Sequence, residues 1–100
     1  MSPDFEWDDN KNRANIEKHG IDFDDVICLF DSQYLNLDSK NKERREKRFI
    51  AFGEVSGHVV AVVYTMRGET IRIISARKAR SDERRAYYSE VSARPPDRSD

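Results

Sequence analysis

The chain has 100 residues, which is enough for one compact domain and too few for a second hydrophobic core. Hydrophobic and charged residues each make up 37% of the chain, so we expect a modest core under a densely ionic surface. No apolar run is long enough to span a bilayer, the first residues lack a signal-peptide pattern, and a single cysteine cannot form an internal disulfide. A soluble cytoplasmic protein that contacts no membrane is therefore expected.

The net charge of -1 conceals an uneven distribution along the chain. Residues 1–40 contain 4 basic and 10 acidic side chains, whereas residues 41–100 contain 14 basic and 9 acidic ones. A basic surface on the second part would attract a phosphate backbone, although most charged runs are simply solvated. Composition leaves nucleic-acid binding and a plain ionic surface both open.

The first twenty residues predict a short strand over 5–7 and a helix over about 8–19. Asp8 or Asp9 can accept the free amides of the first helical turn, and Gly20 supplies the left-handed residue that ends the helix. The apolar stripe of this helix is thin, so we expect it to lie across the surface.

A second helix is predicted after Asp22, which serves as its N-cap. Its apolar face would contain Val26, Ile27 and Phe30. Because Cys28 stands among these apolar neighbours, its thiol is expected to be buried and slow to react with alkylating agents.

The middle of the chain predicts a meander of four strands joined by short turns. A polar run over 39–48 is expected to form a charged connection. The strands alternate apolar and polar residues, and they are expected over 34–38, 48–54, 58–66 and 70–76.

A last helix is predicted from about Ser81 to Val91, with Ser81 as its cap. Residues 92–100 are expected to form a disordered tail, which leaves a single domain over 1–91. The fold class is α+β, with an antiparallel curved sheet covered by helices on one side.

Signatures of metal and nucleotide chemistry are missing from the sequence. It has no paired-cysteine site, no His-Glu-x-x-His helix, no phosphate loop and no serine on a Gly-x-Ser-x-Gly elbow. We therefore expect neither a metal nor another cofactor.

The segment from Arg67 to Arg85 holds seven lysines and arginines, several of them inside an apolar strand. Such arginines need anions, either carboxylates of the same chain or phosphates of a ligand. A two-residue turn at 68–69 would place Arg67 and Arg72 on one face of the sheet and Arg77 on the other, unless a bulge intervenes. The pairs expected from this register are Arg67 with Thr70, Thr65 with Arg72 and Val60 with Arg77.

Metal-free cleavage of RNA needs a base for the 2′-hydroxyl, groups that stabilise charge on the phosphate, and an acid for the leaving oxygen. The chain offers such groups, and each also has a purely structural explanation. They are His19 and His58 as titratable side chains, Glu83 as base, Arg67, Arg77 and Arg84 as charge stabilisers, and Tyr87 or Tyr88 as acid or stacking surface.

Five segments, in this order, resemble the BrnT family of toxins from bacterial type II toxin–antitoxin pairs. The segments are FEWD at 5–8, KHGIDF at 18–23, VVYTMRG at 62–68, RIISARKA at 72–79 and ERRAY at 83–87. The resemblance implies a RelE-like fold and a ribonuclease that arrests translation. It also implies a BrnA-like antitoxin that neutralises the toxin and binds DNA, so that this chain meets DNA only through its partner.

The resemblance directs attention to particular side chains. Catalytic roles are expected for His19, Arg67, Arg77, Glu83, Arg84 and Tyr87. RNA binding is expected for Arg72, Lys78, Arg80 and Arg85. Two alternatives stay open, namely a non-catalytic basic binding module and an inactive toxin homologue that only binds its antitoxin.

Overall fold

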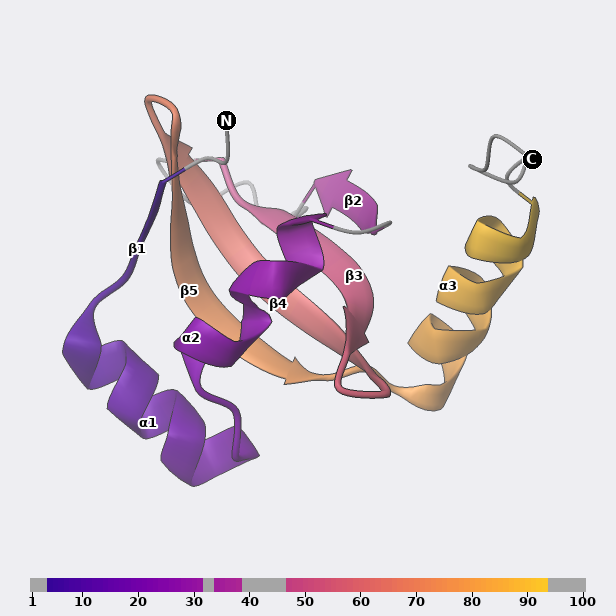
Figure 1. The fold of residues 1–100 in the computed structure, drawn as a ribbon, viewed down its shortest axis with the longest axis horizontal. Helices are drawn as coiled ribbons and strands as arrows, with labels where there is room; N and C mark the ends of the chain where they lie inside the picture. Colours follow the sequence, from indigo (N-terminus) through magenta and orange to yellow (C-terminus); the bar gives the residue numbers. More distant parts are fainter. Residues whose placement is uncertain (1–3, 32–33, 39–46, 94–100) are drawn as a thin grey trace.

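The computed structural model describes residues 4–31, 34–38 and 47–93, which form one sheet with helices on both of its faces (Figure 1). The α+β class predicted from the sequence is confirmed. The elements are β1 Phe5–Glu6, α1 Asp9–His19, α2 Phe23–Val26, the 3-10 helix η1 Ile27–Asp31, β2 Leu35–Asp38, β3 Phe49–Val55, β4 His58–Arg67, β5 Thr70–Lys78 and α3 Ser81–Ala93.

Helix α1 begins and ends where its capping residues predict. The Asp8 carboxylate accepts hydrogen bonds from the amides of Asn10 and Lys11 at 2.8 and 3.1 Å, and Gly20 adopts a left-handed conformation with φ of 71°. Asn15 is the one buried side chain of α1, so the helix lies on the surface as predicted.

The second helical segment differs from the prediction. Asp22 caps it as expected, but α2 has four residues before the chain tightens into η1. Val26 and Leu29 point into the core, while Cys28 is exposed, so the expected buried thiol is wrong. The tighter 3-10 turn changes which residues share a face, and Cys28 falls on the solvent side.

The sheet has the order β1-β5-β4-β3-β2, and the meander from β2 to β5 is antiparallel as predicted. Strand β1 pairs in parallel with β5, so the sheet is mixed and the fully antiparallel prediction is wrong. The intervening helices and strands give the chain the length that a parallel return requires.

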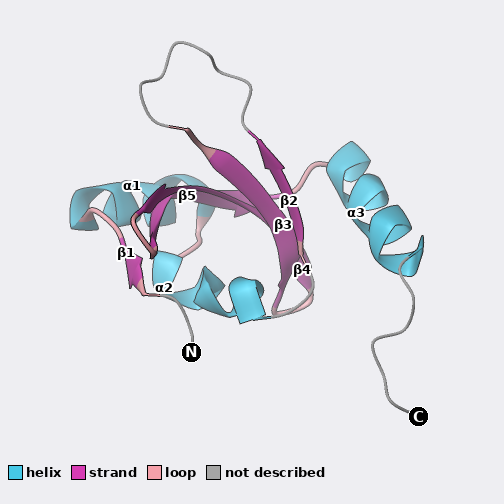
Figure 2. Ribbon diagram, turned by 90° about the horizontal axis from the view of Figure 1, so that it is seen from above, coloured by secondary structure: helices cyan, strands magenta, loops and turns pink. Residues whose placement is uncertain are grey.

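The two faces of the sheet are covered unequally. Phe23, Val26 and Leu29 of α2 and η1 are fully buried against one face. Helix α3 lies on the opposite face, where Tyr87 packs against Phe52 of β3 and a few neighbours (Figure 2). The prediction that the helices share one side is therefore wrong, because the chain crosses the end of the sheet after β5.

A β-bulge interrupts the pairing of β4 with β5 between Val63 and Tyr64. The expected pairs of Arg67 with Thr70 and of Thr65 with Arg72 are present, whereas Arg77 lies opposite Ala61 and not Val60. One extra residue in β5, Ile74, accounts for this shift. Strict alternation would place Arg72 and Arg77 on opposite faces of the sheet. Because of the extra residue, they share one face.

Asn15 of α1 stabilises the irregular part of β5. Its side-chain amide donates to the Ala76 carbonyl at 2.9 Å and its oxygen accepts from the Ala76 amide at 3.1 Å. The same amide donates to the Ile21 carbonyl at 2.9 Å. The side chain thus satisfies the backbone of β5 beyond the short β1, where buried peptide groups would otherwise lack partners.

The last helix starts in a different way from the prediction. Ser81 is already helical, and the Glu83 carboxylate accepts the Arg80 backbone N–H at 2.8 Å. Helix α3 runs to Ala93, two residues beyond the predicted end. The predicted tail beyond Ala93 and the charged connection over 39–46 lie outside the described residues.

Candidate functional site

Three arginines from β4 and β5 lie on the face of the sheet that α3 contacts. Arg67 and Arg72 reach this face by the register of the hairpin, and Arg77 joins them because of the bulge. We call Arg67, Arg72 and Arg77 the arginine face. Thr65 and Ser75 are the small polar side chains on the same face between them.

Two members of the arginine face have carboxylate partners. Arg72 donates to Glu6 of β1 at 2.8 Å, and Arg77 donates to both carboxylate oxygens of Glu83 at 2.8 and 3.0 Å. The side chains of Arg72 and Arg77 are 27% and 29% exposed, so part of each guanidinium reaches solvent. Arg67 is exposed and has no ion pair within the described part of the chain.

Glu83 is held by two arginines at the start of α3. Besides Arg77, the Arg80 guanidinium lies 3.0 Å from its carboxylate, and the Arg80 amide donates to it. The hydrogen bonds from Arg77 lower the pKa of Glu83 to about 2, against a smaller opposing effect of burial. A carboxylate with such a low pKa is a weak proton acceptor near neutral pH, and its contacts orient Arg77.

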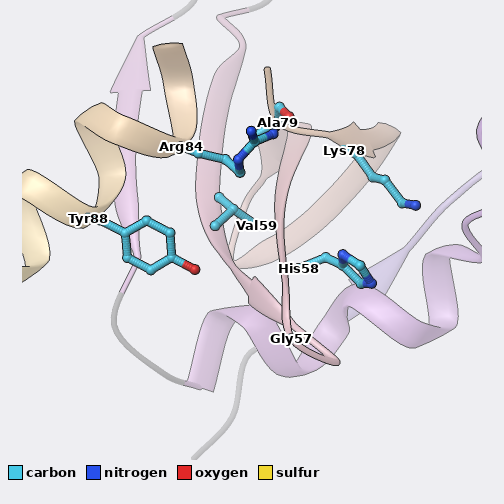
Figure 3. A pocket seen from close by; sticks show the side chains of 7 residues that line it. All are labelled: Gly57, His58, Val59, Lys78, Ala79, Arg84 and Tyr88. Atoms are coloured by element: carbon cyan, nitrogen blue, oxygen red, sulfur yellow. Dashed lines mark hydrogen bonds between the residues drawn. The ribbon is translucent and has the colours of Figure 1, made fainter. Parts of the chain in front are cut away.

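A cavity of about 270 Å³ lies at the end of the sheet where β5 leads into α3 (Figure 3). Val59 and Ala79 continue the arginine face into this cavity. The other residues that line it are Gly57, His58, Lys78, Arg84 and Tyr88. We call it the cationic cleft because Lys78 and Arg84 bring positive charge to it.

The cleft crosses the end of the sheet. Figure 3 shows Arg84 and Tyr88 of α3 on one side of Val59, with His58 and Lys78 on the other side. Arg84 is fixed by a hydrogen bond of 3.2 Å from its Nη1 to the Ala79 carbonyl. Within the described residues neither His58 nor Lys78 has an ion pair. The cleft therefore groups the cations of Lys78 and Arg84, and the carboxylate of Glu54 reaches its rim through Tyr88.

Tyr88 contributes a phenol at the rim of the cleft. Its hydroxyl donates to the Glu54 carboxylate of β3 at 2.8 Å. This hydrogen bond raises the pKa of Tyr88, so the phenol keeps its proton in the neutral range. Tyr88 is 44% exposed, which leaves aromatic surface open to a ligand.

The structure brings together some of the predicted site residues near the cleft. Lys78 and Arg84 line it, while Arg77, Arg80 and Glu83 form the adjacent ion-pair cluster. Tyr87 is only 4% exposed, and its ring lies 5.2 Å from that of Tyr88. Tyr88 is therefore the more accessible of the two tyrosines.

Other predicted residues lie elsewhere. Arg67 is at the far end of β4 from His58, a span of about 30 Å at ~3.3 Å per residue. Arg72 lies at that same end of the hairpin. His19 lines a separate hollow of about 290 Å³ with Lys11, Lys18 and Ser75 among its lining residues. Arg85 is exposed on α3 and does not line the cleft.

Three residues at the cleft were placed less well from the sequence. The sequence indicates His58 and Tyr88 as reactive groups without assigning them to the site, and it gives no indication of Glu54. The pairing of β4 with β5 would have linked His58 to Lys78, because it sets Val60 opposite Lys78. For Tyr88 and Glu54 the sequence carries no comparable signal, since their contact depends on where α3 packs.

Fold and site together describe a small α+β protein with a basic face and a cationic cleft suited to an anionic polymer. Residues 7–83 match the family described as ribonuclease toxin, BrnT, of type II toxin-antitoxin systems. The chain belongs to this family of ribonuclease toxins, which implies an RNA substrate and an antitoxin partner. No curated protein matches the sequence.

The matched region contains the whole arginine face, Lys78 and Glu83, whereas Arg84 and Tyr88 lie beyond its end. Within the described residues, no three metal-binding side chains are grouped as a site for an ion. In the same part of the chain, no helix has the length and apolarity to cross a membrane.

Proposed function

We propose that the protein is a metal-independent endoribonuclease that arrests translation and is neutralised by a BrnA-like antitoxin, on a fold related to RelE. The observation that carries this proposal is the bulge in β5, which gathers Arg67, Arg72 and Arg77 on one face. The arginine face adjoins the cationic cleft at its Arg77 end. An RNA strand lying along it would meet guanidinium groups at its phosphates and the reactive groups at its end.

The chemistry proposed for the cleft is transfer within the RNA strand itself. The 2′ oxygen forms a bond to phosphorus, and the bond from phosphorus to the 5′ oxygen breaks. One proton leaves the 2′-hydroxyl and another is delivered to the 5′ oxygen. Arg84, which is held by the Ala79 carbonyl, and the neighbouring Lys78 stabilise the charge that grows on the phosphate oxygens.

His58 is the proposed proton-transfer residue. An imidazole is the side chain whose ordinary titration falls in the neutral range, and His58 lies at the rim of the cleft beside Lys78. Tyr88 offers its ring for base stacking, while its hydroxyl is bound to Glu54. This assignment replaces Glu83 as base, since that carboxylate is occupied by Arg77 and Arg80.

The other predicted residues take supporting roles. Glu83 positions Arg77, and Tyr87 holds α3 against the sheet. Arg67, Arg72, Arg80 and Arg85 bind flanking phosphates. His19 belongs to the hollow beside α1 and is proposed to be outside the reaction centre.

A second candidate function is favoured by one observation. Glu6 and Glu83 already compensate the charge of Arg72 and Arg77, so this part of the face attracts RNA phosphates less strongly than unpaired arginines would. A non-catalytic module would bind its antitoxin here and cut no RNA. A catalytic toxin would be inhibited by the same contact.

The two histidines provide a matched test. Labelled RNA is incubated with the wild type, His58→Gln and His19→Gln, each with and without a chelator. We expect cleavage to survive the chelator and His58→Gln to lower the rate by about a hundredfold, the scale of general acid–base catalysis. His19→Gln should stay within about twofold. The opposite ranking would move the reaction centre to α1, and tight RNA or antitoxin binding without any cleavage would favour the binding module.

A further inference from the structure

A second cavity adjoins the cationic cleft on the α2 side of the sheet. It has a volume of about 180 Å³ and shares two lining residues, His58 and Lys78, with the cleft. Both side chains extend from the ends of their strands toward this side (Figure 3). Whatever occupies the second cavity is therefore next to the proposed reaction centre.

The walls of the second cavity are apolar and its rim is polar. Ile21 and Val55 are its partly exposed apolar lining residues, and Val26 and Val60 lie beneath them in the main core. Apolar walls suit the face of a planar ring better than a phosphate. The cavity is small, which favours a single ring system over a larger ligand.

Asp25 of α2 is the carboxylate that lines this cavity. No ion pair or hydrogen bond engages its side chain within the described residues. An ionised carboxylate has two acceptor oxygens and no donor, so it selects a ligand that presents donors. The cavity thus combines apolar walls with one anionic acceptor.

We propose that this cavity is a nucleobase subsite that prefers guanine. Among the four RNA bases, guanine alone presents two adjacent N–H donors on its Watson–Crick edge, which a carboxylate accepts together. Adenine, cytosine and uracil each place an acceptor beside their donor, and that acceptor would face the Asp25 oxygens. With the base held here, its phosphate reaches Lys78 and His58 at the shared rim.

This inference rests on the proposed function for its RNA substrate, but its test does not need cleavage. Binding of the four nucleoside monophosphates is measured by calorimetry for the wild type, Asp25→Asn and the control Asp24→Asn. Asp24 is the neighbouring carboxylate on α2, which is exposed like Asp25 but does not line the cavity. We expect the guanosine nucleotide to bind about tenfold more tightly than the others, the scale of hydrogen bonds to a charged group.

Asp25→Asn should remove this preference, because the amide replaces one acceptor with a donor, and Asp24→Asn should keep it. Equal binding of the four nucleotides, or a preference that survives Asp25→Asn, would overturn the subsite. If the wild type shows the preference but never cuts RNA, the subsite stands and the proposed ribonuclease activity fails. If RNA is cut with no dependence on Asp25, the activity stands and the subsite fails.

Discussion

The two ends of the β4–β5 hairpin are both basic, and they use their charge differently. At the turn end, Arg72 is bound to Glu6 and links β1 to the sheet. At the other end, His58 and Lys78 stand beside Arg84 without a carboxylate partner among the described residues. An arginine paired with a carboxylate of its own chain links two structural elements. A cation that lines a cavity without an ion pair is available to a ligand.

Arg77 shares features with both ends of the hairpin. Its guanidinium is bound by Glu83, as Arg72 is bound by Glu6, yet it lies beside the cleft. The bidentate contact fixes the direction of the guanidinium and leaves part of it exposed. We therefore propose the cleft end as the catalytic end, and the following changes test that proposal.

The largest effect is expected for Arg84 in the cleft. Arg84→Ala removes a cation whose position is fixed by the Ala79 carbonyl, so the rate of RNA cleavage should fall by about a hundredfold. Arg85→Ala, one residue further along α3, removes an exposed cation outside the cleft and should change the rate by less than about threefold. Single-turnover kinetics on both variants give the comparison. Equal losses would mean that α3 supplies general charge and no fixed catalytic group.

The next effect concerns Glu83 and is seen in stability. The folded pKa of about 2 lies below the ordinary value of 4.5, so the ionised carboxylate stabilises the fold. This contribution is complete above about pH 4.5 and is lost as the pH falls toward 2. Glu83→Gln should therefore lower the free energy of unfolding by about 1–3 kcal/mol at pH 7 and by little near pH 2.

Urea unfolding across this pH range measures the Glu83 effect, with Glu90→Gln as the control because Glu90 is exposed on the same helix. A difference that persists unchanged at low pH would show that the carboxylate is not the source of the stabilisation. The cleavage rate should also fall in Glu83→Gln, because Arg77 loses the contact that orients it.

Capping residues and the alternation of polar and apolar residues predicted most of the helices and strands. Asp8, Gly20 and Asp22 fixed helix boundaries because their contacts are local and independent of the rest of the chain. The pairing of Arg67 with Thr70 followed from a two-residue turn. These features are decided by residues within a few positions of one another.

The long-range features could not be predicted in the same way. The bulge at Ile74 lies beside Ala76, whose backbone is bound by Asn15, a side chain 61 positions away. Parallel pairing of β1 and the placement of α3 also depend on packing between distant segments. Because the bulge decides which arginines share a face, the site depends on the part of the fold that the sequence pattern reveals least.

A smaller effect is expected for the ion pair at the turn end. Arg72 and Glu6 are 27% and 39% exposed, so water and salt screen their attraction. A double-mutant cycle of Arg72→Gln with Glu6→Gln should give a coupling free energy of about 0.2–1 kcal/mol. It should decrease in 1 M salt. A coupling above about 2 kcal/mol would mean that this end depends on its ion pair as strongly as the Glu83 cluster does.

The smallest effect on the chemical step is expected for Arg67, which the family resemblance marks as catalytic. Its side chain is exposed, and β4 separates it from His58 by about 30 Å. Arg67→Ala should leave the free energy of unfolding within about 0.5 kcal/mol and the single-turnover rate within about twofold. Binding of a long RNA should weaken, and the slope of log affinity against log salt should fall by about one, as expected for one lost phosphate contact.

A short RNA that cannot reach both ends of the hairpin serves as the control for Arg67, since its affinity should not change in Arg67→Ala. If instead the single-turnover rate falls a hundredfold with affinity preserved, Arg67 acts on the transition state. The reaction centre would then lie at the turn end of the arginine face, where Thr65 and Arg72 are its neighbours. The cleft would be left as a binding site for flanking nucleotides, because a single phosphate cannot contact both ends of β4.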